Sequence, residues 1–166
     1  RLQDGYLPIP SVEWKHDRFG LQVTGFVQGR PEQAQLVARY WLHNPDKVAH
    51  EYRLALAVRP FQVNPPSQFL NTVGGVSRIE QLAVQRAQVA VNGQPRVFAA
   101  TPPDAGFASA FDSKFDVTHL ADRTLPGTRE VSDPTGLASG AMLYTWKLEP
   151  GQSREVALVL PQTGNW

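Results

Sequence analysis

Prolines and glycines interrupt this chain along its whole length, 14 of the first and 13 of the second in 166 residues. Such a spread suits many short strands joined by turns. Between the breaks, apolar and polar residues alternate with period two, which is typical of strands that bury one face. We therefore predict an all-β fold, an antiparallel β-sandwich with about eight or more strands.

Composition narrows the class of protein. Hydrophobic residues make up 42% of the chain and charged residues 19%, which indicates a globular domain, and the length suits one domain spanning 1–166. The absence of cysteine excludes disulfides and cysteine-based zinc sites. A net charge of +1 implies no attraction to nucleic acid or to an anionic membrane, and no long apolar run marks a membrane span. Because the sequence opens at Arg1 without a methionine or a signal-peptide pattern, we expect a fragment of a longer, multidomain protein.

A first β-hairpin is predicted near the start of the chain. Residues 12–16 and 21–27 alternate between apolar and polar, and residues 18–20 can turn the chain between them. Trp14 alternates in phase with the apolar positions of its strand, as does Trp146 near the end of the chain. We therefore expect both indole rings to pack in the core.

A second hairpin is predicted between residues 34–42 and 52–58. Its turn is Asn44-Pro45-Asp46-Lys47, where proline presets φ and the Asn and Asp side chains accept backbone hydrogen bonds. Trp41 is out of phase with the apolar face of strand 34–42. It lies instead on the polar face, together with Arg39 and His43. Two interpretations of Trp41 stay open, an exposed platform for a sugar ring or part of an interface.

The second half of the chain is less regular. Residues 78–91 favour strands with a bulge near Ala87, although their composition would tolerate a helix over 78–90. Asn92-Gly93 between two apolar runs predicts a hairpin turn. A short helix over 113–121 is a further possibility.

The chain ends on a predicted closing hairpin. Residues 142–148 and 156–160 alternate between apolar and polar on either side of the turn Glu149-Pro150-Gly151-Gln152.

Carboxylate pairs give little sign of catalysis. Glu13 and Asp17 are four residues apart, as are Asp112 and Asp116, but a glycosidase needs two carboxylates about 5–10 Å apart in space, which sequence spacing does not show. We interpret the first pair as solvated strand surface and the second as loop capping. An ion bound at a loop carboxylate such as Asp112, Asp116 or Asp133 stays an open alternative.

The histidines do not predict a metal site. His16, His43, His50 and His119 lack a metal-ligand spacing, although His43 and His50 flank one turn, where they can approach each other. We predict no catalytic residue, no metal and no cofactor.

Residues 60–77 follow neither the period-two pattern of a strand nor the pattern of a helix. Three prolines and two glycines exclude a regular helix or a central strand there, while Phe61, Phe69 and other apolar residues argue against disorder. We predict a long ordered loop that buries apolar groups. Its neutral amide side chains suit sugar hydroxyls, whereas a second interpretation folds the loop back over the edge of its own sandwich.

This loop resembles a segment of large bacterial glycosidase-like proteins, over residues 58–71 and the Gly-Gly-Val at 74–76. In those proteins a β-sandwich, of the supersandwich or galactose-mutarotase-like kind, precedes a helical (α/α) six-hairpin toroid. The segment 39–45 and the closing pair of strands also resemble elements of such sandwiches, so that the resemblance spans residues 20–161. An immunoglobulin-like sandwich is the alternative.

The resemblance implies a non-catalytic accessory domain of a carbohydrate-active, glycoside hydrolase-like protein. The catalytic carboxylates of such proteins lie on the toroid, for which this chain is too short. The sandwich would pack against the helical catalytic domain of the same parent chain and lend its loop to the substrate cleft. The expected glycan-binding or interface residues are Arg59, Phe61, Gln62, Asn64, Gln68, Phe69 and Asn71 of the loop, together with Trp41.

Two other functions stay open at this stage. One is a stand-alone carbohydrate-binding module that uses Trp41 and the loop aromatics, and the other is a structural immunoglobulin-like linker domain. The expected partners are the helical domain and a glycan, with neither nucleic acid nor membrane. A periplasmic or secreted location is favoured over the cytoplasm.

Overall fold

The computed structural model describes residues 1–60, 77–111, 113, 120, 125 and 127–162. These residues form β-strands and turns, with one short 3-10 helix, η1, at Pro31–Gln33. None of their helical segments is long and apolar enough to cross a membrane. The strands are β1 (Leu2–Gln3), β2 (Leu7–His16), β3 (Phe19–Gln28), β4 (Gln35–His43), β5 (His50–Val58), β6 (Gln81–Val84), β7 (Gln88–Val91), β8 (Gln94–Ala99), β9 (Ala105–Ser109), β10 (Glu130–Ser132), β11 (Ser139–Leu148) and β12 (Ser153–Pro161).

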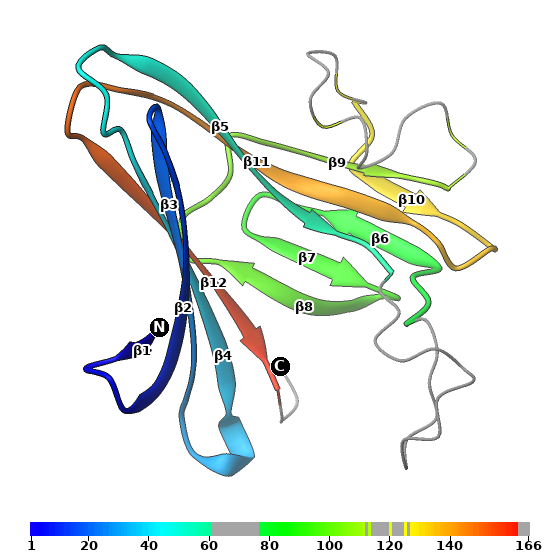
Figure 1. Ribbon diagram of the computed structural model, residues 1–166. Coiled ribbons are helices and arrows are strands. Elements are labelled where there is room, and N and C mark those ends of the chain that lie inside the picture. The colour runs from blue at the N-terminus through cyan, green and yellow to red at the C-terminus, as the bar shows by residue number, and fades with distance from the viewer. Residues whose placement is uncertain (61–76, 112, 114–119, 121–124, 126, 163–166) are drawn as a thin grey trace, which may run out of the picture.

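The strands form two antiparallel sheets that pack face to face (Figure 1). The larger sheet has the order β1-β2-β3-β4-β12-β8-β7-β6-β10, and the smaller has the order β5-β11-β9. This arrangement confirms the predicted all-β antiparallel sandwich. The predicted ordered loop at 60–77 lies almost wholly outside the described residues.

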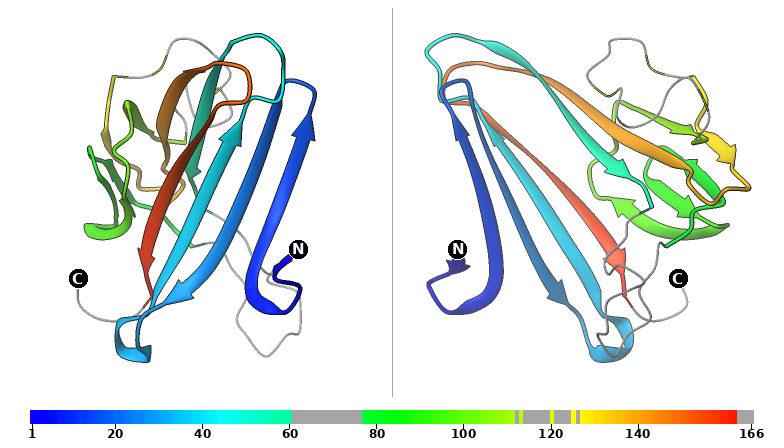
Figure 2. Two further views of the ribbon diagram at one scale, coloured as in Figure 1. Left: turned by 90° about the vertical axis from the view of Figure 1, so that its left-hand side faces the viewer. Right: turned by 45° about the vertical axis from the view of Figure 1, so that its right-hand side comes forward.

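The larger sheet divides into two parts at one weak seam. β12 pairs with β8 only at Leu158↔Ala99 and Val159↔Phe98, whereas it pairs with β4 along its whole length. We refer to β1, β2, β3, β4 and β12 as the long wing. Figure 2 shows these strands side by side in its left panel, with no other strand in front of them.

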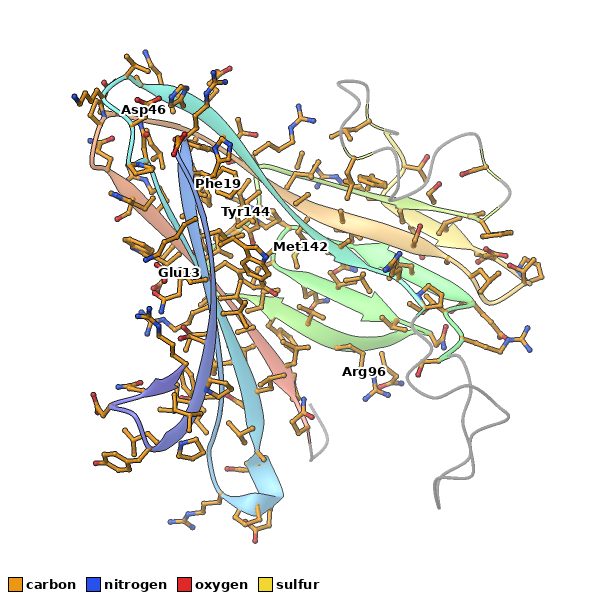
Figure 3. All side chains as sticks on the ribbon, viewed as in Figure 1. Glu13, Phe19, Asp46, Arg96, Met142 and Tyr144 are labelled. Carbon is orange, nitrogen blue, oxygen red and sulfur yellow. The ribbon has the colours of Figure 1, made fainter. Side chains whose placement is uncertain are left out.

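The hydrophobic core lies between β6, β7 and β8 of the larger sheet and β5 and β11 of the smaller sheet, with β12 contributing at one side. Met142 and Tyr144 of β11 lie between the layers (Figure 3). The Tyr144 hydroxyl donates a hydrogen bond to the Thr101 carbonyl oxygen at 2.9 Å. Burial, followed by the charge of Asp104, raises the pKa of this phenol to about 12. The predicted core position of Trp146 is confirmed in part, because its half-buried ring stacks on Tyr144.

Two glycines allow the layers to approach closely. A Cβ on Gly106 of β9 would lie 2.6 Å from Cγ1 of Val84, and one on Gly140 of β11 would overlap the backbone oxygen of Phe107. A Cβ on Gly140 would also lie 2.9 Å from Cδ2 of Leu82. The close packing of β9 and β11 onto β6 therefore requires glycine, which has no Cβ, at both positions.

The hairpin predicted over 34–58 is wrong in its pairing, although its strands and its turn are where the pattern puts them. β4 pairs with β3 and β12, whereas β5 pairs with β11 in the other sheet. The chain therefore crosses from one sheet to the other at residues 44–49. The closing hairpin is wrong in the same way, since β11 and β12 also belong to different sheets.

Asn44 joins the two connections that cross between the sheets. Its side chain is fully buried, and its Nδ2 donates to the carbonyl oxygens of Val48 and Leu148, each at 2.9 Å. Its backbone N–H donates to the Gln152 carbonyl, and its backbone oxygen accepts from the Gly151 N–H. One side chain thus ties the β4–β5 crossing to the β11–β12 crossing, at the end of the sandwich where Figure 3 labels Asp46.

Residues 78–91 form strands, as favoured, and not a helix. The predicted bulge near Ala87 is instead a reversal of the chain, in which the Gln85 N–H donates to the Gln88 carbonyl between β6 and β7. The Asn92-Gly93 hairpin is confirmed, because both residues have positive φ (51° and 76°) between β7 and β8. The helix over 113–121 falls largely outside the described residues.

The first hairpin is confirmed, but its burial is not. β2 and β3 pair from Ser11↔Thr24 to His16↔Phe19, so the turn lies at residues 17–18. Trp14 is 50% exposed, which contradicts its predicted core position. Trp14 lies on the same face of the sheet as Leu21 and the core-facing side chains of β4. It stays exposed because the smaller sheet, β5-β11-β9, does not cover β2.

Candidate functional site

Trp41 lies near the middle of the long wing, on the face that points away from the sandwich core. On β4 it stands opposite Gln22 of β3 on one side and Glu155 of β12 on the other. Residues that pair across antiparallel strands share a face, so Gln22, Trp41 and Glu155 form one row across three strands. Arg39 and Thr24 form the next row.

A hollow of about 460 Å³ opens over these two rows. Short β1 forms its rim, because it pairs with the beginning of β2 at the edge of the wing. The wall is mostly polar with one large aromatic ring, and its residues are Arg1, Leu2, Gln3, Ile9, Ser11, Gln22, Thr24, Arg39, Trp41 and Glu155. The hollow thus combines an indole with amide, hydroxyl, guanidinium and carboxylate groups.

Arg39 and Glu155, which both line this hollow, form a bidentate ion pair. Nε of Arg39 donates to Oε1 of Glu155 at 3.2 Å, and its Nη2 donates to Oε2 at 2.6 Å. The hydrogen bonds to Glu155 raise the pKa of the guanidinium above its ordinary value. Both side chains keep substantial exposure, 49% for Arg39 and 38% for Glu155. A ligand therefore meets a fixed, neutralised pair of charges, with guanidinium donors and carboxylate acceptors.

The Trp41 ring is held by a neighbour on its own strand. The imidazole of His43, two residues further along β4, stacks on the indole with 5.2 Å between ring centroids and 7° between ring planes. Nδ1 of His43 is buried and has no hydrogen-bond partner in the described part of the chain. The imidazole therefore covers one indole face, and the indole contributes to the wall of the hollow.

The predicted site residues do not come together. Trp41 lines the hollow, whereas Arg59 is exposed just beyond the end of β5 and is not part of that wall. Phe61, Gln62, Asn64, Gln68, Phe69 and Asn71 lie outside the described residues. The sequence analysis did not predict Arg39, Glu155, Gln22 or Thr24 as site residues. The available signal was that each lies at a polar position in the alternation of its strand.

The histidines near the first crossing have separate partners. His50 Nε2 lies 2.7 Å from Oδ2 of Asp46, whereas His43 stacks on Trp41. The hydrogen bond with His50, followed by one from the Lys47 N–H, lowers the pKa of Asp46. Within the described ranges, no group of three or more His, Asp or Glu side chains is placed to hold a metal ion.

The loop carboxylate Asp133 caps a turn. It is buried and accepts hydrogen bonds from the Thr135 hydroxyl at 2.6 Å, the Thr135 N–H at 2.9 Å and the Phe111 N–H at 2.9 Å. These bonds, that from the Thr135 hydroxyl first, lower the pKa of the carboxyl group. Glu13 is paired with Lys15 at 3.3 Å, and Asp112 and Asp116 lie outside the described residues.

A scan of protein-family models and a search of curated proteins both find no match to this chain.

Proposed function

We propose that this chain is a non-catalytic, glycan-binding β-sandwich domain of a larger carbohydrate-active protein, and that the hollow around Trp41 holds the glycan. The observation that carries the proposal is the placement of an indole and the Arg39–Glu155 pair on one open face. A pyranose ring has an apolar C–H face and a rim of hydroxyls. The indole suits the first, and the fixed donors and acceptors suit the second.

The mixed polar wall favours a neutral sugar. Arg39 and Glu155 compensate each other's charge, so the pair itself attracts neither an anionic nor a cationic ligand, and Arg1 is the other charged residue of the wall. The amide of Gln22 and the hydroxyl of Thr24 both donate and accept, which matches the hydroxyl groups of a saccharide. A volume of about 460 Å³ suits a ligand of one to a few sugar rings.

The accessory role next to a helical catalytic domain belongs to the same proposal. It rests on the resemblance of residues 58–71 and 74–76, most of which lie outside the described residues. A glycan-binding face on such a domain would hold substrate close to the catalytic cleft.

A titration of the chain with soluble neutral oligosaccharides tests the proposal. A panel of glucans, xylans, mannans and galactans is screened by isothermal calorimetry, and the best binder is measured against Trp41→Ala and Arg39→Ala. We expect each variant to raise the per-site Kd about tenfold or more, because one removes the ring platform and the other breaks the charge pair.

Trp14→Ala is the matched control. Trp14 is also an exposed tryptophan, on a nearby strand of the same sheet, but it projects from the opposite face. Its replacement should leave the per-site Kd of a soluble oligosaccharide unchanged. Equal effects of the two tryptophan variants, or no binding to any member of the panel, would overturn the proposed site.

A further inference from the structure

A second hollow, of about 650 Å³, opens on the long wing near the β4–β5 crossing. Its wall comes from the end of the β2–β3 hairpin, the end of β4 and the crossing itself, the region where Figure 3 labels Phe19 and Asp46. The residues of the wall are Glu13, Lys15, His16, Asp17, Phe19, Gly20, His43, Pro45, Asp46 and Lys47. The wall of the hollow around Trp41 is made of other residues.

The two hollows are neighbours along β4. Gly20 of β3 pairs with Lys15 of β2 and with His43 of β4, and this row directly follows the row of Gln22 and Trp41. Alternate residues of a strand share a face, so both rows lie on the face that points away from the core, roughly 7 Å apart. The stacked rings of Trp41 and His43 lie between the hollows, and one ring lines each.

Gly20 makes room for the second hollow. Its φ lies outside the left-handed region, and among the described residues a Cβ built there would meet nothing closer than the Cβ of His43, at 3.9 Å. Neither the backbone nor the packing therefore requires glycine here, in contrast to Gly140. Glycine inside a strand costs stability and often marks a place where another group approaches the backbone. The missing side chain leaves space above the sheet for a ligand.

Phe19 supplies an apolar ring to the same wall. Its side chain is 36% exposed and stacks on His16, with 5.5 Å between ring centroids and 19° between ring planes. The second hollow therefore repeats the combination found around Trp41, an aromatic ring beside charged and polar groups.

The charges of the second hollow favour a neutral ligand. Lys15 and Lys47 accompany three carboxylates, those of Glu13, Asp17 and Asp46, and Lys15 lies 3.3 Å from Glu13. An anionic chain therefore meets no excess of positive charge in this wall. A neutral sugar can use the same groups as hydrogen-bond donors and acceptors for its hydroxyls.

We propose that the second hollow holds further sugars of the same glycan, so that the domain binds a linear neutral oligosaccharide that lies along β4. This proposal rests on the proposed function, since the first hollow must hold a glycan. From Arg39 through Trp41 to His43 the face extends over four residues of β4, roughly 13 Å, which is longer than one pyranose ring. A chain that fills both hollows makes more contacts than one that fills the first alone. Affinity should therefore increase with chain length.

Calorimetry with oligosaccharides of increasing length tests this proposal. Glucan, xylan, mannan and galactan oligosaccharides of about two to about six units cover ligands that fill one hollow and ligands that fill both. For the glycan that binds, we expect the Kd to fall at least about tenfold from the shortest member to the longest.

Gly20→Val fills the second hollow, and Gly25→Val is its matched control. Both glycines lie on β3 with φ outside the left-handed region and with space for a Cβ, but Gly25 pairs with Ala38 on the core-facing side. Valine suits a strand at either position. Gly20→Val should raise the Kd of the longest oligosaccharide about tenfold and leave that of the shortest within about twofold. Gly25→Val should change neither.

Phe19→Ala is a second, independent variant. It removes the aromatic ring from the same wall and should also weaken the binding of the longest oligosaccharide only. His43 is kept in all variants, because it also stacks on Trp41. Circular dichroism of each variant checks that the fold persists.

The outcomes separate this proposal from the one on which it rests. If no oligosaccharide of any length binds, both are overturned. If binding depends on Trp41 but not on chain length, the first hollow stands and the second holds no sugar. The second hollow is also refuted if Gly20→Val and Phe19→Ala both keep the dependence on length, or if Gly20→Val weakens the shortest and the longest members equally. Equal effects of Gly20→Val and Gly25→Val would show that the change acts through β3 as a whole and would refute it as well.

Discussion

Replacing Asn44 with alanine should destabilise the sandwich more than any other single loss of a polar side chain that we describe. The change removes three hydrogen bonds: Nδ2 to the Val48 oxygen, Nδ2 to the Leu148 oxygen, and the Asp46 N–H to Oδ1 at 3.0 Å. Each contributes about 1 kcal/mol, and the buried Leu148 carbonyl is left without a partner at a further cost of about 1–2 kcal/mol. We expect a loss of about 3–5 kcal/mol, a large share of the stability of an ordinary domain.

Urea unfolding followed by tryptophan fluorescence measures this loss in the free energy of unfolding. The m value, the slope of that free energy against urea concentration, is compared between variants to check for two-state behaviour. Asn44→Asp separates hydrogen bonding from volume, because the carboxylate fits the space but cannot donate to the Val48 and Leu148 oxygens. Its deficit at pH 7 should equal or exceed that of the alanine variant. These oxygens would raise the pKa of the new carboxyl group, so the deficit should shrink as the pH falls through that raised value.

Asn92→Gly is the matched control for burial. The Asn92 side chain also makes three hydrogen bonds, to the N–H groups of Glu80 and Gln81 and to the Arg78 oxygen, but it is exposed. Water can replace those bonds, and the positive φ of this residue suits glycine, so we expect a loss of about 1 kcal/mol. If the alanine variant at Asn44 lost no more than this control, the role assigned to the buried amide would be refuted.

Three further predictions concern packing and pH. Gly140→Ala should cost about 1–3 kcal/mol in urea unfolding, because the new Cβ meets the backbone oxygen of Phe107, which cannot move aside; a loss below about 0.5 kcal/mol would contradict this close packing. The lowered pKa of Asp133 makes its contribution to stability complete above the unfolded-state value of about 3.9 and lost as the pH falls through the lower folded-state value. The acid-induced drop in stability should therefore be smaller in Asp133→Asn than in the parent chain, as measured by urea midpoints between pH 5 and pH 2. The raised pKa of Tyr144 has the opposite sign: its contribution is complete below the unfolded-state value of about 10 and is lost as the pH rises toward about 12, and Tyr144→Phe should remove that dependence.

Local patterns are enough to place most strands and turns of this fold. Period-two alternation located β2, β3, β4 and β5, and the Asn-Gly pair located the turn between β7 and β8. Alternation says which residues share a face, but it does not say which strand lies alongside. Alternation therefore predicts a hairpin at both crossings. The hydrogen bond that joins the crossings runs from Asn44 to a carbonyl 104 residues away, which no local pattern contains.

The candidate site shows the same limit. The phase of Trp41 marked it as unusual, because an indole on a polar strand face needs an explanation. The Arg39–Glu155 pair depends on the register of β12 against β4, which no local pattern contains. Trp14 had the phase of a core residue, but its burial depended on how far the smaller sheet extends over β2.

The pairing of β4 with β12 also affects how the protein is made. Arg39 and Glu155 are 116 residues apart in the chain, so a ribosome takes roughly 6–23 s to add the second after the first. Until then β4 lacks one neighbour, and contacts of such long range form slowly even in the complete chain. The face that carries Trp41 is thus assembled only once β12 docks, so binding of the proposed glycan would report that β12 has been made and has paired with β4.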